Sequence, residues 1–116
     1  MTEKFNIIEL VEDFNQYITK VTSGSLVIAE NLRKKQISIA LKDITNFVEG
    51  MNWLISVSKY LKVQNVETGF DEQKIVGYFE EINEGLTVQD YFLVADLFEY
   101  EIAQYFENIP GVVVEN

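Results

Sequence analysis

The sequence predicts an all-α protein, a four-helix up-down bundle that opens with a long first helical hairpin. Apolar residues recur at intervals of three and four along most of the 116 residues, which is the periodicity of helices with one buried face. One proline and six glycines leave few turn signals for a β-rich fold. A hydrophobic content of 47% supplies a core, and this length suits one domain, so we expect a single all-α domain over residues 1–116.

The first helix is predicted over about residues 5–33. Its inward residues alternate steps of four and three, and they are Ile7, Val11, Phe14, Ile18, Val21, Ser25, Ile28 and Leu32. Gly24 lies within this series without disturbing its phase. We therefore predict one continuous helix that tolerates Gly24 at a cost of about 1 kcal/mol. A break near Gly24 into two shorter helices is the alternative.

The second helix is predicted over about residues 38–60, after a tight basic turn at 33–36. Its core face comprises Ile37, Ala40, Leu41, Ile44, Phe47, Val48, Met51, Leu54 and Ile55. Four apolar residues fall off this face: Ile39, Trp53, Val57 and Tyr60. Trp and Tyr are favoured interface anchors, so Trp53 and Tyr60 are candidate partner-binding residues. The alternative is that Trp53 covers the neighbouring helix of the same chain.

Two shorter helices follow the longest predicted loop, which covers residues 61–69. The third begins with Asp71 as N-cap and continues to about Gly85, with Ile75, Phe79 and Ile82 inward. Thr87 or Asp90 caps the fourth, which continues to about Asn108, where Ile109, Pro110 and Gly111 end it.

The fourth helix is apolar on two sides. Its core stripe is predicted to be Tyr91, Val94, Ala95, Phe98, Ile102, Tyr105 and Phe106. A second stripe of Leu93, Leu97 and Tyr100 is bordered by Asp96 and Glu101. Either the long hairpin covers both stripes, or the second stripe meets a partner. We select the second stripe and its two acids as the candidate partner-binding surface.

Charge narrows the class of partner. The net charge is −10, and the last 46 residues hold eleven acids against one base, Lys74. This half therefore repels nucleic acid and favours a cationic or mixed partner. With no histidine and no cysteine, the chain lacks the usual ligands of zinc and copper, so carboxylate sites for Mg²⁺ or Mn²⁺ are what remains. We expect no cofactor and no bound metal.

The sequence shows neither a signal-peptide pattern nor a membrane-spanning stretch. The N-terminus has no basic region followed by an apolar run, and no stretch approaches 18 apolar residues. We therefore expect a cytoplasmic protein with no membrane partner.

Acidic residues offer an enzymatic alternative. Glu81 and Glu84 precede Asp96 and Glu99 on the next helix, and all-α nucleoside triphosphate pyrophosphohydrolases hold Mg²⁺ with acidic pairs of this kind. Glu81 and Glu84, however, are predicted to point away from Ile75 and into solvent. We interpret the acids as a solvated face and predict a protein that is not an enzyme.

Two stretches resemble a known family. Residues 30–44 read ENLRKKQISIALKDI and lead into FVEGMNWL at 47–54, and residues 90–101 read DYFLVADLFEYE. Together they resemble an uncharacterised family of small acidic helical proteins of Gram-positive bacteria, over residues 30–106. The sequence departs from the family pattern at Phe98 and near Gln104. The resemblance implies an all-α fold and carries over no catalytic residue. Some such proteins accompany motility genes, which implies an adaptor for an exported filament protein.

These observations lead to one functional prediction. We expect a non-enzymatic helical interaction or adaptor protein that associates with itself as a homodimer. The alternative is a chaperone-like adaptor for a helical client. The cellular role and the identity of any client stay open at this point.

Overall fold

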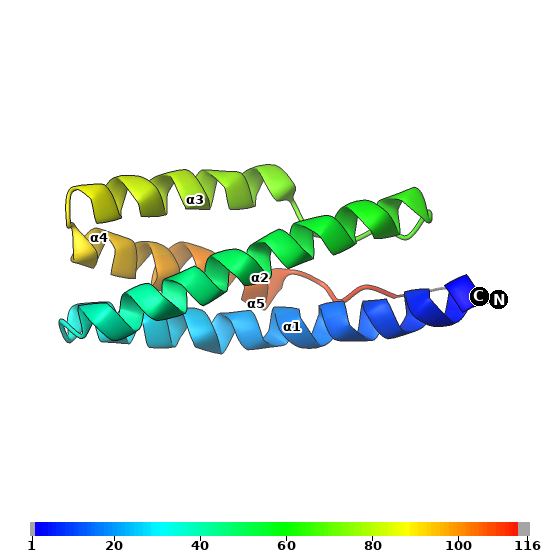
Figure 1. Ribbon diagram of the computed structural model, residues 1–116, viewed down its shortest axis with the longest axis horizontal. Coiled ribbons are helices and arrows are strands. Elements are labelled where there is room, and N and C mark those ends of the chain that lie inside the picture. The colour runs from blue at the N-terminus through cyan, green and yellow to red at the C-terminus, as the bar shows by residue number, and fades with distance from the viewer. Residues whose placement is uncertain (1, 114–116) are drawn as a thin grey trace.

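In the computed structural model, which describes residues 2–113, the chain forms an elongated antiparallel helical bundle of 50 × 21 × 21 Å. Helices α1 (Thr2–Arg33) and α2 (Ile37–Val63) make a long hairpin, and α3 (Glu72–Thr87) follows. Three consecutive segments then form one uninterrupted helix, α4 (Tyr91–Asp96), η1 (Leu97–Ile102) and α5 (Ala103–Asn108), here called the C-terminal helix. The C-terminal helix packs on α1 and α3, so the predicted all-α bundle with a long first hairpin is confirmed (Figure 1).

Helix α1 is continuous through Gly24, so the predicted unbroken helix is confirmed and the break does not occur. Gly24 is exposed, and a Cβ atom there would meet nothing within 4 Å. Close packing of another helix therefore does not explain this glycine. Its neighbour Ser25 is buried, and its hydroxyl has no hydrogen-bond partner. The small-residue segment thus fits an α-helix because the strong apolar pattern on either side of it outweighs the low helix propensity of glycine.

Helix α2 crosses the rest of the bundle at an angle, and this changes two expectations (Figure 1). Leu41, predicted in the core, is 39% exposed, whereas Val57, predicted off the core face, is 6% exposed. A helix that crosses its neighbours presents a different side to them at each end. The prediction assumed one buried side along all of α2, so it is wrong for residues near the two ends. The central Phe47, Met51 and Leu54 are buried as predicted.

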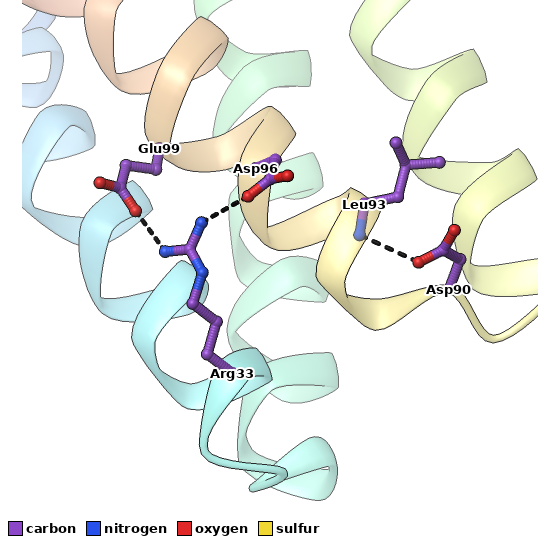
Figure 2. Close-up of polar contacts among 5 residues, drawn as sticks. All are labelled: Arg33, Asp90, Leu93, Asp96 and Glu99. Carbon is purple, nitrogen blue, oxygen red and sulfur yellow. Dashed lines mark hydrogen bonds and ion pairs between the residues drawn. The ribbon is translucent and has the colours of Figure 1, made fainter.

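Two aspartates begin the shorter helices. The Asp71 carboxylate accepts hydrogen bonds from the backbone N–H of Gln73 at 3.0 Å and of Lys74 at 3.4 Å. The Asp90 carboxylate accepts one from the N–H of Leu93 at 3.1 Å (Figure 2). Each aspartate satisfies helix donors that have no intrahelical acceptor. Both predicted N-caps are confirmed, with Asp90 rather than Thr87 capping the C-terminal helix.

The wide π-helical turn η1 has a clear origin in the sequence. Four residues of the C-terminal helix recur every four positions, and Val94, Phe98, Ile102 and Phe106 are all at most 2% exposed. An α-helix completes a turn in 3.6 residues, so a four-residue step overshoots by about 40° and three steps overshoot by about 120°. A turn closed by i→i+5 hydrogen bonds takes up this drift. The π-helix keeps all four side chains in the core.

Residues 109–113 return along α1. The side-chain amide of Asn15 donates to the carbonyl of Val112 at 3.0 Å and accepts from its N–H at 2.8 Å. Val112 is 7% exposed and packs in the core. This pairing fixes residues 109–113 against the first helix.

None of the helices within residues 2–113 combines the length and the apolar character that crossing a membrane requires.

Candidate interaction surface

The candidate site is an acidic groove between α3 and the C-terminal helix. Its volume is about 210 Å³, and it is lined by Glu81, Glu84, Leu93, Asp96, Leu97, Tyr100 and Glu101. Five of these seven residues belong to the predicted partner-binding set, and the two glutamates come from the neighbouring helix α3. The groove therefore has an apolar floor with carboxylates on both rims.

The predicted apolar stripe divides into covered and exposed parts. Leu93 is 54% exposed and Tyr100 is 63% exposed, as expected for a surface. Leu97 is 5% exposed, so the expectation that it is part of an exposed surface is wrong. The reason is that α3 packs against η1 and covers this part of the C-terminal helix. Leu97 forms the floor of the groove, and Leu93 and Tyr100 remain accessible beside it.

A second hollow of about 500 Å³ adjoins the acidic groove. Tyr100 and Glu101 line both, and Lys74, Tyr78 and Tyr105 line the second hollow alone. The Tyr105 hydroxyl accepts a hydrogen bond from the Asp71 N–H at 2.7 Å, which fixes the start of α3 against the C-terminal helix. The two hollows together follow the seam between these helices.

Burial and nearby negative charge raise the pKa of one residue in each hollow, Glu81 in the acidic groove and Tyr78 in the second hollow. Burial, reinforced by the Glu101 and Glu84 carboxylates, raises the pKa of Glu81 above its ordinary value. Burial, with Glu101, Tyr105 and Glu81 nearby, raises the pKa of the Tyr78 phenol to about 12. Both shifts have the same physical cause, because a negative charge is harder to form where solvent is displaced and other negative charges are close.

Arg33 of α1 forms ion pairs with two acids of the C-terminal helix. Its guanidinium, at the end of α1, donates hydrogen bonds to Asp96 at 2.7 Å and to Glu99 (Figure 2). The same guanidinium lies 5.9 Å from the centre of the Tyr100 ring. The two carboxylates raise the pKa of Arg33, which holds it in the charged form. Two acids at one edge of the surface thus share one cation from within the chain.

The opposite edge is not neutralised. Among the ion pairs found in the described part of the chain, none involves Glu81, Glu84 or Glu101. Nor does any group of three or more acidic side chains within residues 7–113 have a geometry that could hold a metal ion. Glu81 and Glu84 of α3 and Glu101 of the C-terminal helix therefore present separated carboxylates to whatever lies in the groove.

The two anchors predicted on α2 lie outside the groove. Trp53 is 38% exposed and packs edge-to-face on Tyr17 of α1, with ring centres 5.8 Å apart. Gly50 makes room for this arrangement, because a Cβ atom there would collide with the Tyr17 hydroxyl. Tyr60 is 40% exposed on the same helix. Trp53 therefore packs on the neighbouring helix α1, as the alternative expectation proposed.

Sequence reasoning did not select the remaining groove residues. Glu81 and Glu84 were expected in solvent, and they are exposed, but they also form one rim of the groove. Arg33 was assigned to a turn rather than to Asp96. The available signal was weak, since it consisted of opposite charges on helices whose relative position the sequence does not give.

Comparisons with known proteins give one match. A family described as "Domain of unknown function (DUF8042)" matches residues 9–110. A search of curated proteins found no match, and a search of solved structures also found none.

Proposed function

This chain belongs to the DUF8042 family of domains of unknown function, and we propose that it acts as a non-enzymatic helical interaction protein whose acidic groove binds a cationic, amphipathic segment of a protein partner. The groove between α3 and the C-terminal helix is the working surface. Apolar side chains of the partner contact Leu93, Leu97 and Tyr100, and its basic side chains approach Glu81, Glu84 and Glu101.

The observation that carries this proposal is the contrast between the two edges of the groove. Asp96 and Glu99 share one cation, Arg33, whereas Glu81, Glu84 and Glu101 lack an ion-pair partner within the described residues. Burial, and after it the nearby Glu101 and Glu84 carboxylates, raises the pKa of Glu81. A cationic side chain in the groove would offset the repulsion among these carboxylates, so binding energy and specificity both favour a basic partner.

A helical client suits the shape of the surface better than a second copy of this chain. The groove follows the seam between two helices. Amphipathic helices commonly bind in such grooves by placing their apolar side chains into them. In a symmetric pair the same carboxylates would face each other, and like charges facing each other at an interface are unfavourable. A chaperone-like or adaptor role toward a basic helical client is consistent with both features.

Fluorescence anisotropy with a labelled amphipathic helical peptide of leucine and lysine tests the proposal. We expect saturable binding that weakens as salt rises, and no binding of the matching peptide with glutamate in place of lysine. Glu101→Gln should weaken binding of the lysine peptide several-fold because it removes one carboxylate without changing side-chain size.

Glu107→Gln is the matched control. Glu107 lies on the same helix, is exposed, and does not line the groove. Its substitution should leave affinity nearly unchanged. Equal binding of both peptides, or equal effects of the two variants, would contradict a specific acidic groove.

A further inference from the structure

We propose that the second hollow, on the seam between α3 and the C-terminal helix, binds a small zwitterion, an α-amino acid with an apolar side chain. Lys74 and the Tyr78 hydroxyl hold its carboxylate, and Glu101 holds its ammonium group. The site does not depend on the proposed function, because Lys74 and Tyr78 line this hollow and not the acidic groove. Its volume of about 500 Å³ is in the range of small-molecule sites.

One positive and one negative side chain line the second hollow, and they do not pair with each other. Lys74 comes from α3 and Glu101 from the C-terminal helix, and the other lining residues are uncharged. Among the ion pairs of the described residues, none involves either one. The Lys74 ammonium instead lies 5.9 Å from the centre of the Tyr105 ring. The hollow therefore presents a cation and an anion at separate points, which matches a ligand that carries both charges.

The separation of the two charges suits an α-amino acid. Lys74 lies beside Tyr105, and Tyr105 follows Glu101 by four residues on the C-terminal helix. Four residues advance a helix by about 6 Å along its axis. Two charge-assisted hydrogen bonds of about 2.8 Å each, with the ligand atoms between them, bridge a gap of this size. The ammonium and carboxylate of an α-amino acid are attached to one carbon, so one such molecule reaches both ends.

Tyr78 supplies a hydrogen-bond donor that the protein leaves unused. It is 4% exposed, and no hydrogen bond within the described part of the chain involves its hydroxyl. By contrast, the Tyr105 hydroxyl accepts from the Asp71 N–H and donates to the Gly69 carbonyl at 3.5 Å. Buried polar groups nearly always have a partner in folded proteins. Because Tyr78 lines the hollow, a ligand there can be that partner.

The two donors belong to one end of the hollow. Lys74 precedes Tyr78 by four residues on α3, so their side chains lie on the same side of that helix. The raised pKa of Tyr78 keeps its hydroxyl protonated at neutral pH, and a protonated phenol donates. A carboxylate accepts from both groups at once. Glu101, on the facing helix, is the acceptor for an ammonium group.

The rest of the lining is suited to the side chain of the ligand. The rings of Tyr100 and Tyr105 line the hollow together with Ile109 and Pro110. Aromatic and aliphatic surfaces of this kind gain free energy when an apolar side chain covers them. An amino acid with an aromatic side chain therefore matches the hollow in both its charged and its apolar parts.

NMR titration of the ¹⁵N-labelled protein tests the inference with three probes: phenylalanine, phenylpropanoate and phenethylamine. The three share an aromatic ring, but phenylpropanoate lacks the ammonium group and phenethylamine lacks the carboxylate. We expect phenylalanine to cause saturable shifts at residues that line the second hollow, with a dissociation constant on the order of millimolar. The other two should bind about tenfold more weakly, because each leaves Glu101 or Lys74 without its counter-charge.

Two substitutions test the assigned roles. Lys74→Met should weaken phenylalanine binding about tenfold, and Tyr78→Phe, which removes only the hydroxyl, should weaken it several-fold. The matched controls are Lys42→Met and Tyr60→Phe, since both residues are exposed on α2 and do not line the hollow. The controls should leave the dissociation constant unchanged, and the amide spectra should confirm that all four variants are folded.

Several results would overturn the inference. One is the absence of saturable shifts with phenylalanine. Another is equal affinity for the three probes, or phenethylamine binding as tightly as phenylalanine, which would make the hollow a site for cations alone. A third is phenylalanine binding that survives both Lys74→Met and Tyr78→Phe, or that the controls weaken equally.

The inference and the proposed function fail separately. Lys74→Met and Tyr78→Phe should leave binding of the lysine peptide at least as strong as in wild type, because neither residue lines the acidic groove. A chain that binds phenylalanine but not the lysine peptide contradicts the proposed function alone. A chain that binds the lysine peptide but not phenylalanine overturns the second-hollow site alone.

Discussion

Leu97 and Tyr100 lie three residues apart on one helix, yet one is 5% exposed and the other 63% exposed. The difference comes from α3, which covers Leu97 and leaves Tyr100 at the edge of the groove. Tyr100 is then available both to the Arg33 guanidinium on one side and to the acidic groove on the other. At this scale, the shape of the proposed binding surface depends on which of two apolar residues a neighbouring helix covers.

Glu81 supplies a pH-dependent prediction. Its folded pKa is raised, so Glu81 contributes stability that is present below its ordinary pKa and is lost as pH rises through the folded value. At neutral pH its charge therefore opposes folding. Glu81→Gln should give a slightly higher melting temperature than wild type at pH 7, and the gap should close below about pH 4, where wild-type Glu81 is protonated. Thermal melts over this pH range provide the measurement.

Glu80→Gln serves as the control for that series, because Glu80 is exposed on the same helix and lies outside the groove. A control that behaves like Glu81→Gln would mean that total charge, rather than the groove, sets the effect.

Ser25 supplies a prediction about the core. Its buried hydroxyl has no hydrogen-bond partner, and an unpaired buried polar group costs free energy. Ser25→Ala should raise the free energy of unfolding by about 1 kcal/mol, measured by urea denaturation. Ser23→Ala, at an exposed position two residues earlier, should change it little. A loss of stability in Ser25→Ala would show that the hydroxyl is satisfied in solution.

At the scale of elements, the C-terminal helix illustrates how a local pattern sets a local geometry. Four buried residues at four-residue spacing do not fit one side of an α-helix, and the π-helical turn between Leu97 and Ile102 reconciles them. The turn also positions Glu101 and Tyr100 at the junction of the two hollows. The irregular turn is thus required by the core and shapes the surface.

Deleting Tyr100 tests this account of the π-helix. With one residue fewer, Ile102 and Phe106 move to spacings that a regular α-helix accommodates, so the turn should become α-helical and the core should persist. We expect a loss of about 1–2 kcal/mol, mainly from the missing Tyr100 contacts. Urea denaturation and backbone chemical shifts would measure the two effects.

Deleting Asn52 is the comparison. Asn52 is exposed within the regular helix α2, and its removal rotates the buried residues that follow by about 100°. That deletion should cost more than about 3 kcal/mol or prevent folding. Equal costs for the two deletions would refute the drift argument.

At the scale of the whole molecule, charge is distributed unevenly over an elongated body. Most of the net charge of −10 lies in α3 and the C-terminal helix, which pack against each other. Screening should therefore stabilise the fold. Raising sodium chloride from about 20 to about 200 mM should raise the melting temperature, since the Debye length falls below about 10 Å.

Glu107→Lys should reduce that salt dependence. It lowers the net negative charge by two units at an exposed position outside both hollows. Its melting temperature in low salt should exceed that of wild type, and its increase with salt should be smaller. A salt dependence equal to that of wild type would indicate that local ion pairs, such as those of Arg33, dominate.

Most helix ends could be predicted from the sequence, because they depend on neighbouring residues. The end of α2 was wrong: the helix continues to Val63 and buries Leu61, where a loop over 61–69 was expected. The unbroken α1 follows from apolar spacing, and Asp71 and Asp90 cap helices whose first N–H groups are within their reach. The candidate surface was predicted in part. Leu93, Tyr100, Asp96 and Glu101 line the groove as one set, while Trp53 packs on Tyr17 elsewhere.

What the sequence by itself determined was the number, length and polarity of the helices, since these follow from periodicity and charge along the chain. Tertiary structure alone decided that α3 covers Leu97, that Arg33 pairs with Asp96 but not with Glu101, and that α2 and α3 leave an apolar groove. The physical reason is that helix periodicity shows which side of a helix is apolar. Which neighbour covers that side depends on crossing angles set by the packing of all the helices together.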